Sequence, residues 1–149
     1  MDKEINITVR SFRSWQKMSA KFPYEHIVIG YRTPGINYPA IQFSPWCRGH
    51  IEINVHDVGG RDNGIGMIMF NESHAIEILN LLLTEQHNIS HGIFQCDAGI
   101  SRSSATAAAI SKIIYGTDEW VFNNPHYVPN MQIYRTILNT FYKQWNGKF

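Results

Sequence analysis

The sequence predicts an α/β fold with a central, mainly parallel sheet flanked by helices. Short apolar runs of strand length alternate with longer segments whose apolar residues recur every three or four positions. A tight loop, CDAGISR, joins one such run directly to an Ala-rich helix, as expected for a parallel α/β sheet. The 149 residues fit one domain, 1–149, because no repeat or flexible linker divides them.

Four apolar runs predict the strands. They lie at residues 5–9, 26–31, 51–55 and 91–95. The run at 51–55 alternates apolar and polar residues, whereas the run at 26–31 is typical of a buried strand. Because ligands bind at the carboxyl ends of parallel strands, we expect the functional residues to follow these runs.

The predicted helices lie between and after these strands. We expect one or two helical turns at 11–20, a helix that begins near Asn71, an Ala-rich helix that ends at Gly116, and a last helix at about 130–145. Asn130 is expected only as a helix cap. The stretch HDVGGRDNGIG at 56–66 contains four glycines and predicts an irregular loop.

Charge and composition exclude several classes of function. Thirteen Lys and Arg offset twelve Asp and Glu without a basic stripe, so no nucleic-acid partner is expected. No apolar stretch is long enough for a bilayer, and the N-terminus lacks the apolar core of a signal peptide, which favours a cytoplasmic protein with no membrane partner. The histidines show no HExxH and no zinc-ligand spacing with cysteine, so we expect no metal and no other cofactor.

The residues after the last predicted strand carry the expected chemistry. Cys96 lies where that strand meets the helix, so loop amides and the helix N-terminus can bind an anion and stabilise a thiolate nucleophile. Gly99 lets the backbone turn tightly, Arg102 offers a planar fork for two phosphoryl oxygens, and Ser103 can hydrogen-bond the sulfur. The phosphate-binding residues are expected to be Asp97, Ala98, Gly99, Ile100, Ser101 and Arg102. Cys47 lacks this setting and is expected to be a small buried hydrophobe.

The motif CDAGISRS resembles the signature of protein tyrosine phosphatases, which is Cys, five residues, Arg and then Ser or Thr. The sequence of the motif is most similar to that of the small dual-specificity-like branch, including compact bacterial and phage forms. The resemblance extends from about Ile27 to the C-terminus through YRTPG, HDV and the PN before the last helix. It implies a phosphatase-like parallel α/β fold, a phosphocysteine intermediate and no cofactor. The chain departs from the family at Gln95, where His is usual.

The resemblance also implies an aspartate that protonates the leaving oxygen and then activates water. Asp57 follows the strand at 51–55, where similar enzymes place this acid, and Asp62 lies inside the glycine-rich loop. We prefer Asp57 and keep Asp62 as the alternative.

The expected partner is a phosphorylated protein or a small phosphomonoester. Asp97 adds a negative charge to the loop, which disfavours polyanions such as phosphoinositides and RNA 5′-triphosphates and leaves phosphotyrosine, with or without phosphoserine and phosphothreonine. Two other functions stay open: a rhodanese-like sulfurtransferase and a non-catalytic phosphate-binding module. A low-molecular-weight phosphatase or arsenate reductase is disfavoured because its loop lies near the N-terminus.

Overall fold

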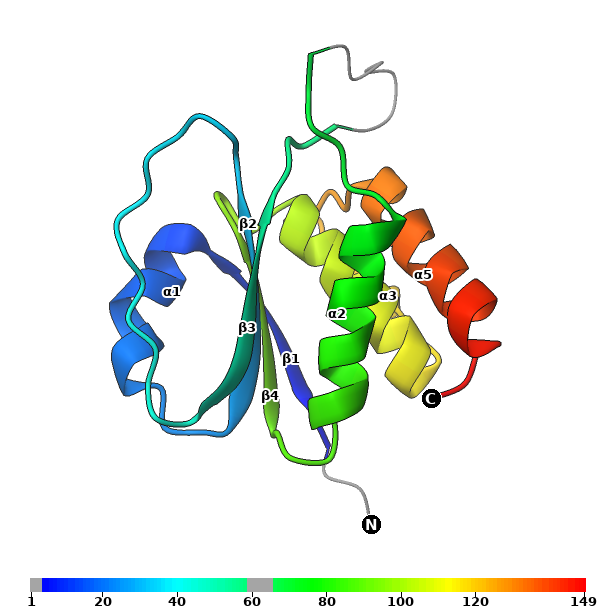
Figure 1. Cartoon of the computed structure of the whole chain (residues 1–149), viewed down its shortest axis with the longest axis horizontal. Coiled ribbons are helices and arrows are strands. Elements are labelled where there is room, and N and C mark those ends of the chain that lie inside the picture. The colour runs from blue at the N-terminus through cyan, green and yellow to red at the C-terminus, as the bar shows by residue number, and fades with distance from the viewer. Residues whose placement is uncertain (1–3, 59–65) are drawn as a thin grey trace.

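The computed structural model describes residues 4–58 and 66–149, and in it a four-stranded sheet forms the centre of the molecule (Figure 1). The strands are β1 (Asn6–Ser11), β2 (His26–Arg32), β3 (Cys47–Asn54) and β4 (His91–Cys96). Their order is β1-β4-β2-β3, and every neighbouring pair is parallel. The predicted α/β class with a parallel sheet is therefore confirmed.

Helices cover both faces of this sheet (Figure 1). They are α1 (Phe12–Met18), α2 (Glu72–Glu85), α3 (Arg102–Tyr115), α4 (Glu119–Phe122) and α5 (Met131–Trp145), with a 3-10 turn at Ser19–Lys21. Helix α1 lies against one face, and α2, α3 and α5 lie on the other. The larger apolar core lies under these three helices, while a smaller cluster around Trp15 and Ile93 lies under α1.

The predicted helix ends agree with the structure. The Asn71 and Asn130 side chains accept backbone N–H groups at the starts of α2 and α5. Helix α3 ends at Gly116, whose φ of 76° is the left-handed conformation that favours glycine.

The larger differences from the prediction concern β3, the segment at 11–20 and α4. Strand β3 begins at Cys47 instead of residue 51, because its first half is a partly exposed edge segment that pairs with β2 without a clear apolar pattern. The segment at 11–20 divides into α1 and the 3-10 turn, and α4 was not predicted at all. Four residues of α4 are too few for a periodic signal.

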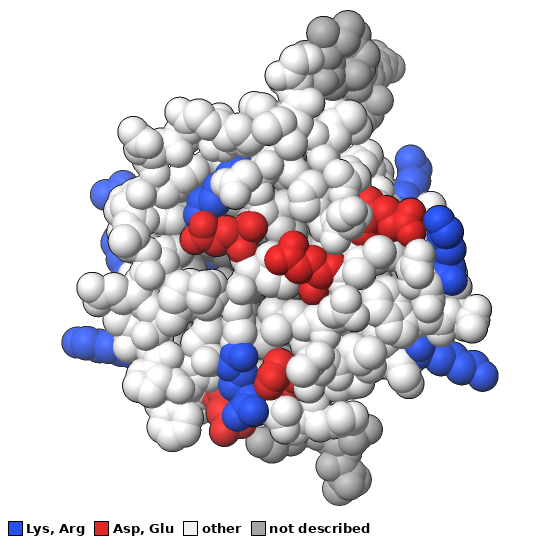
Figure 2. All heavy atoms as spheres, in the orientation of Figure 1, with Lys and Arg blue, Asp and Glu red and all other residues white. Residues whose placement is uncertain are grey.

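Acidic and basic side chains are interspersed over the described part of the face drawn in Figure 2, with no continuous basic stripe. Ion pairs join Arg48 to Glu85 at 3.0 Å and Lys143 to Glu72 at 3.3 Å. Within residues 4–58 and 66–149, no helix has both the length and the apolar character to cross a bilayer.

Candidate active site

Residues 96–102, hereafter the phosphate loop, connect the end of β4 to the start of α3. Its carbonyls bond outward: Asp97 O accepts from Phe12 N at 3.3 Å, Ile100 O from Val128 N at 3.0 Å, and Ser101 O from Asn130 N at 3.0 Å. Among the described residues, no backbone N–H of 97–101 donates to another group. The loop is thus anchored by its acceptors while its donors stay available for an anion.

Gly99 is required by the shape of the loop. Its φ is 69°, and a Cβ there would lie 2.8 Å from both the Arg10 carbonyl carbon and the Ser11 nitrogen. Both constraints involve backbone, which cannot rotate away as a side chain would. The tight turn predicted from the sequence is therefore closed against the junction of β1 and α1.

Cys96 lies at the base of the phosphate loop and is 3% exposed. Its Sγ is 3.0 Å from the Ser103 Oγ, which is itself fully buried in the first turn of α3. The structure thus brings together the cysteine and the serine that the motif predicted as partners.

Arg102 is 4% exposed, which rules out a surface position in the first turn of α3. Its Nη1 donates to the Val55 carbonyl at 2.8 Å, and its Nη2 donates to Asp97 Oδ2 at 3.0 Å. The buried Nε has no partner among the described residues. Because a guanidinium has five N–H donors in one plane, the Nε–H and one Nη2–H remain unused, and the edge that Nε and Nη2 share is the one that suits two phosphoryl oxygens.

Asp57 is held beside the phosphate loop by two side chains. Its Oδ1 accepts from Ser101 Oγ at 2.9 Å and from Asn130 Nδ2 at 2.7 Å. The Asn130 Nδ2 also donates to Val58 O at 2.9 Å, while its Oδ1 caps α5. Asp57 is itself exposed, so a substrate can reach it.

The described ends of the glycine-rich segment are joined by a pair of hydrogen bonds. His56 N donates to Ile68 O at 2.8 Å, and Ile68 N donates to His56 Nδ1 at 2.9 Å. In the second of these bonds the His56 Nδ1 is the acceptor, so it carries no proton there. The competing acid candidate, Asp62, lies outside the described residues.

The Asp97 carboxylate is bound from two sides. Thr33 Oγ1 donates to its Oδ2 at 2.8 Å and Tyr38 Oη to its Oδ1 at 2.6 Å, and Arg102 Nη2 also donates to Oδ2. Burial alone would raise the pKa of Asp97, but the hydrogen bonds from Tyr38 and Thr33 and the charge of Arg102 together bring it below its usual value. Asp97 is therefore charged at neutral pH.

Gln95, at the position where the family usually has His, bonds to a buried arginine. Its Oε1 accepts from Arg32 Nη1 at 2.9 Å, and Arg32 is 6% exposed. The Arg32 guanidinium also lies 4.7 Å from the Phe12 ring centroid and 5.3 Å from that of Tyr38. A Cβ at Gly30 would lie 2.9 Å from both polar groups of this pair, which accounts for glycine in the middle of β2.

The remaining predictions concern Cys47 and metals. Cys47 is half-buried instead of fully buried, and its thiol lies 3.5 Å from the Gly49 carbonyl. Burial raises the pKa of this thiol. Over residues 4–58 and 66–149, no group of three or more His, Cys, Asp and Glu could hold a metal ion.

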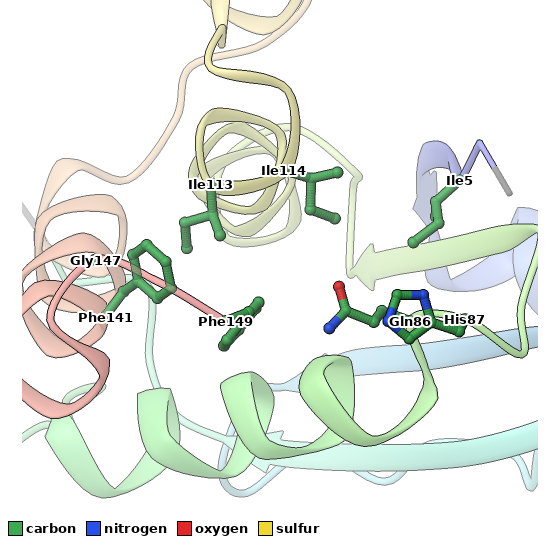
Figure 3. A pocket seen from close by; sticks show the side chains of 8 residues that line it. All are labelled: Ile5, Gln86, His87, Ile113, Ile114, Phe141, Gly147 and Phe149. Atoms are coloured by element: carbon green, nitrogen blue, oxygen red, sulfur yellow. The ribbon is translucent and has the colours of Figure 1, made fainter. Parts of the chain in front are cut away.

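A cavity of about 230 Å³ opens at the opposite end of the molecule, near the C-terminal end of α3 (Figure 3). It is lined mainly by apolar side chains, with the Phe149 ring between α2 and α3. Cys96 and Arg102 lie at the other end of α3, so this cavity is separate from the phosphate loop.

Sequence reasoning missed four residues around this site. Thr33 and Tyr38 lie within and just after the YRTPG segment that the resemblance used, Arg32 precedes them, and Asn130 was expected only as a cap. Their side chains bond to Gln95, Asp97 or Asp57 across 59 to 73 positions of sequence, so no local spacing signals them.

No protein-family model and no curated protein matches the sequence. Solved structures do match. DUSP15 superposes with a TM-score of 0.59 at 17% identity, covering 100% of this chain and 96% of its own. Human DUSP28 gives 0.58 at 14% identity with 94% of each chain covered, and PTPMT1 in complex with PI(5)P gives 0.58 at 9% identity, covering 95% of this chain and 90% of its own. The chain therefore has the fold of the small, dual-specificity-like protein tyrosine phosphatases.

Proposed function

We propose that the chain is a metal-independent phosphatase that hydrolyses phosphomonoesters, phosphotyrosine above all, through a phosphocysteine intermediate. One observation carries the proposal: a single loop combines the Cys96–Ser103 pair with an Nε of buried Arg102 and backbone amides that have no partner in the described part of the chain. A buried cation with an unused donor edge is costly unless an anion binds there. A phosphoryl group meets that requirement.

In the first step, the Cys96 thiolate attacks phosphorus and the bond from phosphorus to the ester oxygen breaks. Asp57 gives its proton to the leaving oxygen, which departs as a neutral alcohol or phenol. The unused edge of Arg102 and the loop amides bind the equatorial oxygens as charge spreads over them in the transition state. The N-terminus of α3 adds favourable potential for the anion.

In the second step, water replaces the sulfur. Asp57, now a carboxylate, takes a proton from the water as its oxygen bonds to phosphorus. The phosphorus–sulfur bond breaks, orthophosphate leaves and the thiolate is restored. The Ser103 hydroxyl, 3.0 Å from Sγ, is placed to donate a hydrogen bond to the departing sulfur.

The charge next to the nucleophile supports a substrate with one phosphate. Asp97 is charged at neutral pH and 38% exposed, so it repels additional phosphates near the loop. PTPMT1, one of the proteins of similar fold, has a crystal structure in complex with PI(5)P, so a phosphoinositide belongs in the test panel. We expect phosphotyrosine peptides to be hydrolysed faster than phosphoinositides.

The deciding experiment is release of phosphate from para-nitrophenyl phosphate in the presence of EDTA. We expect turnover by the wild-type chain and none by Cys96→Ser, which retains affinity for inorganic phosphate because the amides and Arg102 remain. Turnover by Cys96→Ser would exclude the cysteine nucleophile. Phosphate binding without turnover in the wild type would favour the non-catalytic module, and sulfur transfer from thiosulfate without phosphate release would favour the sulfurtransferase.

A further inference from the structure

We propose that Asp97 is a positioning residue whose carboxylate holds the Arg102 guanidinium in the orientation that binds phosphate. Hydrogen bonds from Thr33 and Tyr38 fix that carboxylate in turn. The inference rests on the proposed function, in that it treats residues 96–102 as a phosphate-binding loop. On this proposal Asp97 strengthens phosphate binding, whereas an unpaired negative charge beside the loop would only repel the substrate.

The hydrogen bonds of Arg102 divide its donors into two sets. Val55 O takes one Nη1–H and Asp97 Oδ2 takes one Nη2–H, whereas the Nε–H has no partner among the described residues. With Nη1 and Nη2 each bonded to a group of the fold, rotation of the guanidinium is restricted. The unpartnered Nε–H is thus oriented before phosphate arrives, which lowers the entropic cost of binding.

Asp97 can hold Arg102 only if its own carboxylate is fixed, and the segment after β2 supplies that support. Thr33 Oγ1 and Tyr38 Oη donate to different oxygens of the carboxylate, at 2.8 and 2.6 Å. The Tyr38 oxygen in turn accepts from Thr33 N at 2.8 Å, so the two donors also hold each other. The buried Arg32 guanidinium lies over the Tyr38 ring and limits its movement.

The test compares phosphate affinities in a Cys96→Ser background, where no turnover is needed. Inorganic phosphate is titrated by calorimetry at pH 7 and fixed ionic strength against Cys96→Ser alone and with Asp97→Asn. Asn keeps the shape but removes the charge, so loss of repulsion alone would strengthen binding. Positioning predicts the reverse, a loss of about tenfold, since a hydrogen bond to a charged group is stronger than one between neutral groups. Unchanged or tighter binding overturns the proposal.

A second variant tests the support without changing any charge on the loop. Tyr38→Phe removes one donor to Asp97, and we expect phosphate affinity to fall about threefold. Tyr142→Phe, an exposed tyrosine on α5, and Glu119→Gln, on α4, are the matched controls and should leave the affinity unchanged. Equal affinity in Tyr38→Phe and its control counts against the proposal even if Asp97→Asn does not fold.

Coupling separates positioning from a general loosening of the loop. In a background that also carries Arg102→Lys, the bond between Nη2 and Asp97 is already lost, so adding Asp97→Asn should change phosphate affinity by no more than about twofold. A full additional loss there would show that Asp97 acts independently of Arg102.

Wild-type turnover is a separate measurement. A chain that binds phosphate as described but hydrolyses nothing would contradict the proposed function and leave this inference standing.

Discussion

The phosphate loop and the segment that carries Asp57 are held in place by different kinds of contact. The loop is bonded through its own backbone carbonyls to α1 and to residues 128 and 130, and its side chains Cys96 and Arg102 are 3% and 4% exposed. Asp57 is exposed and is held by two side-chain hydrogen bonds, from Ser101 and Asn130.

This difference matches what each region has to do in the proposed reaction. The loop must keep its amides and the Arg102 fork oriented throughout, since preorganised donors stabilise the transition state at no cost of rearrangement. The acid must reach different leaving groups and exchange a proton with water, which an exposed carboxylate on adjustable contacts can do. Substitutions in the two regions should therefore differ in their dependence on the leaving group.

The largest expected effect is that of Asp57→Asn on a poor leaving group. With a phosphotyrosine peptide, kcat/KM should fall about 10²–10⁴-fold, because the leaving phenolate no longer receives a proton. An ester whose leaving group departs unaided should be affected far less, and the basic limb of the pH profile for kcat/KM should disappear.

Asp62→Asn is the matched control for this prediction. If the leaving-group dependence follows Asp62 instead, the acid is misassigned while the mechanism stands. If neither variant shows it, the proton comes from another group.

Arg102→Lys should lower kcat/KM about 10²–10³-fold, because one ammonium cannot reproduce a planar pair of donors. The loss should be similar for good and poor leaving groups, which is the opposite signature to Asp57→Asn. Parallel assays with both esters measure this contrast, and a rate close to that of the wild type would mean that the arginine is structural.

Asn130→Ser should have a smaller effect, which tests the link between the two regions. Serine can still cap α5 but cannot donate to Asp57 and Val58, so we expect a loss of about threefold to tenfold in kcat/KM for phosphotyrosine. Asn71→Ser makes the same substitution at the N-cap of α2, whose hydrogen bonds in the described part of the chain do not include Asp57, and is the control. Equal losses of kcat/KM in the two variants would show that Asn130 acts only as the cap of α5.

The smallest effect concerns stability at acidic pH, which must be separated from the pH profile of the reaction. Burial lowers the pKa of His26, His74 and His91 below the usual value of about 6.5, and at His26 it outweighs the hydrogen bond to the Tyr24 carbonyl, which raises the pKa. The unfolded chain therefore takes up protons before the folded chain does. The free energy of unfolding should be constant above this range and decrease as pH falls through 6.5.

Urea unfolding at several pH values measures this dependence. His26→Gln should make it shallower, whereas His126→Gln, at an exposed position, should not. A free energy of unfolding that increases toward pH 5 would contradict the assignment.

Local pattern was sufficient for much of this molecule. The caps at Asn71 and Asn130 and the end of α3 at Gly116 were predicted from the sequence because each depends on interactions within a few residues. The same holds for the grouping of Cys96, Ser103 and Arg102, since eight consecutive positions at a strand-to-helix junction bring them together. The parallel α/β class was predicted from the alternation of strand and helix patterns along the chain.

Only the tertiary structure decided what surrounds that motif. Asn130 reaches Asp57 across 73 positions, and Thr33 and Tyr38 reach Asp97 across 64 and 59 positions, by contacts that parallel strand order and helix packing create. The sequence showed Asp97 as a lone negative charge, whereas in the fold it has three donors. A side chain's type determines which bonds it can make, but its partners depend on which distant segments the sheet brings to the same edge.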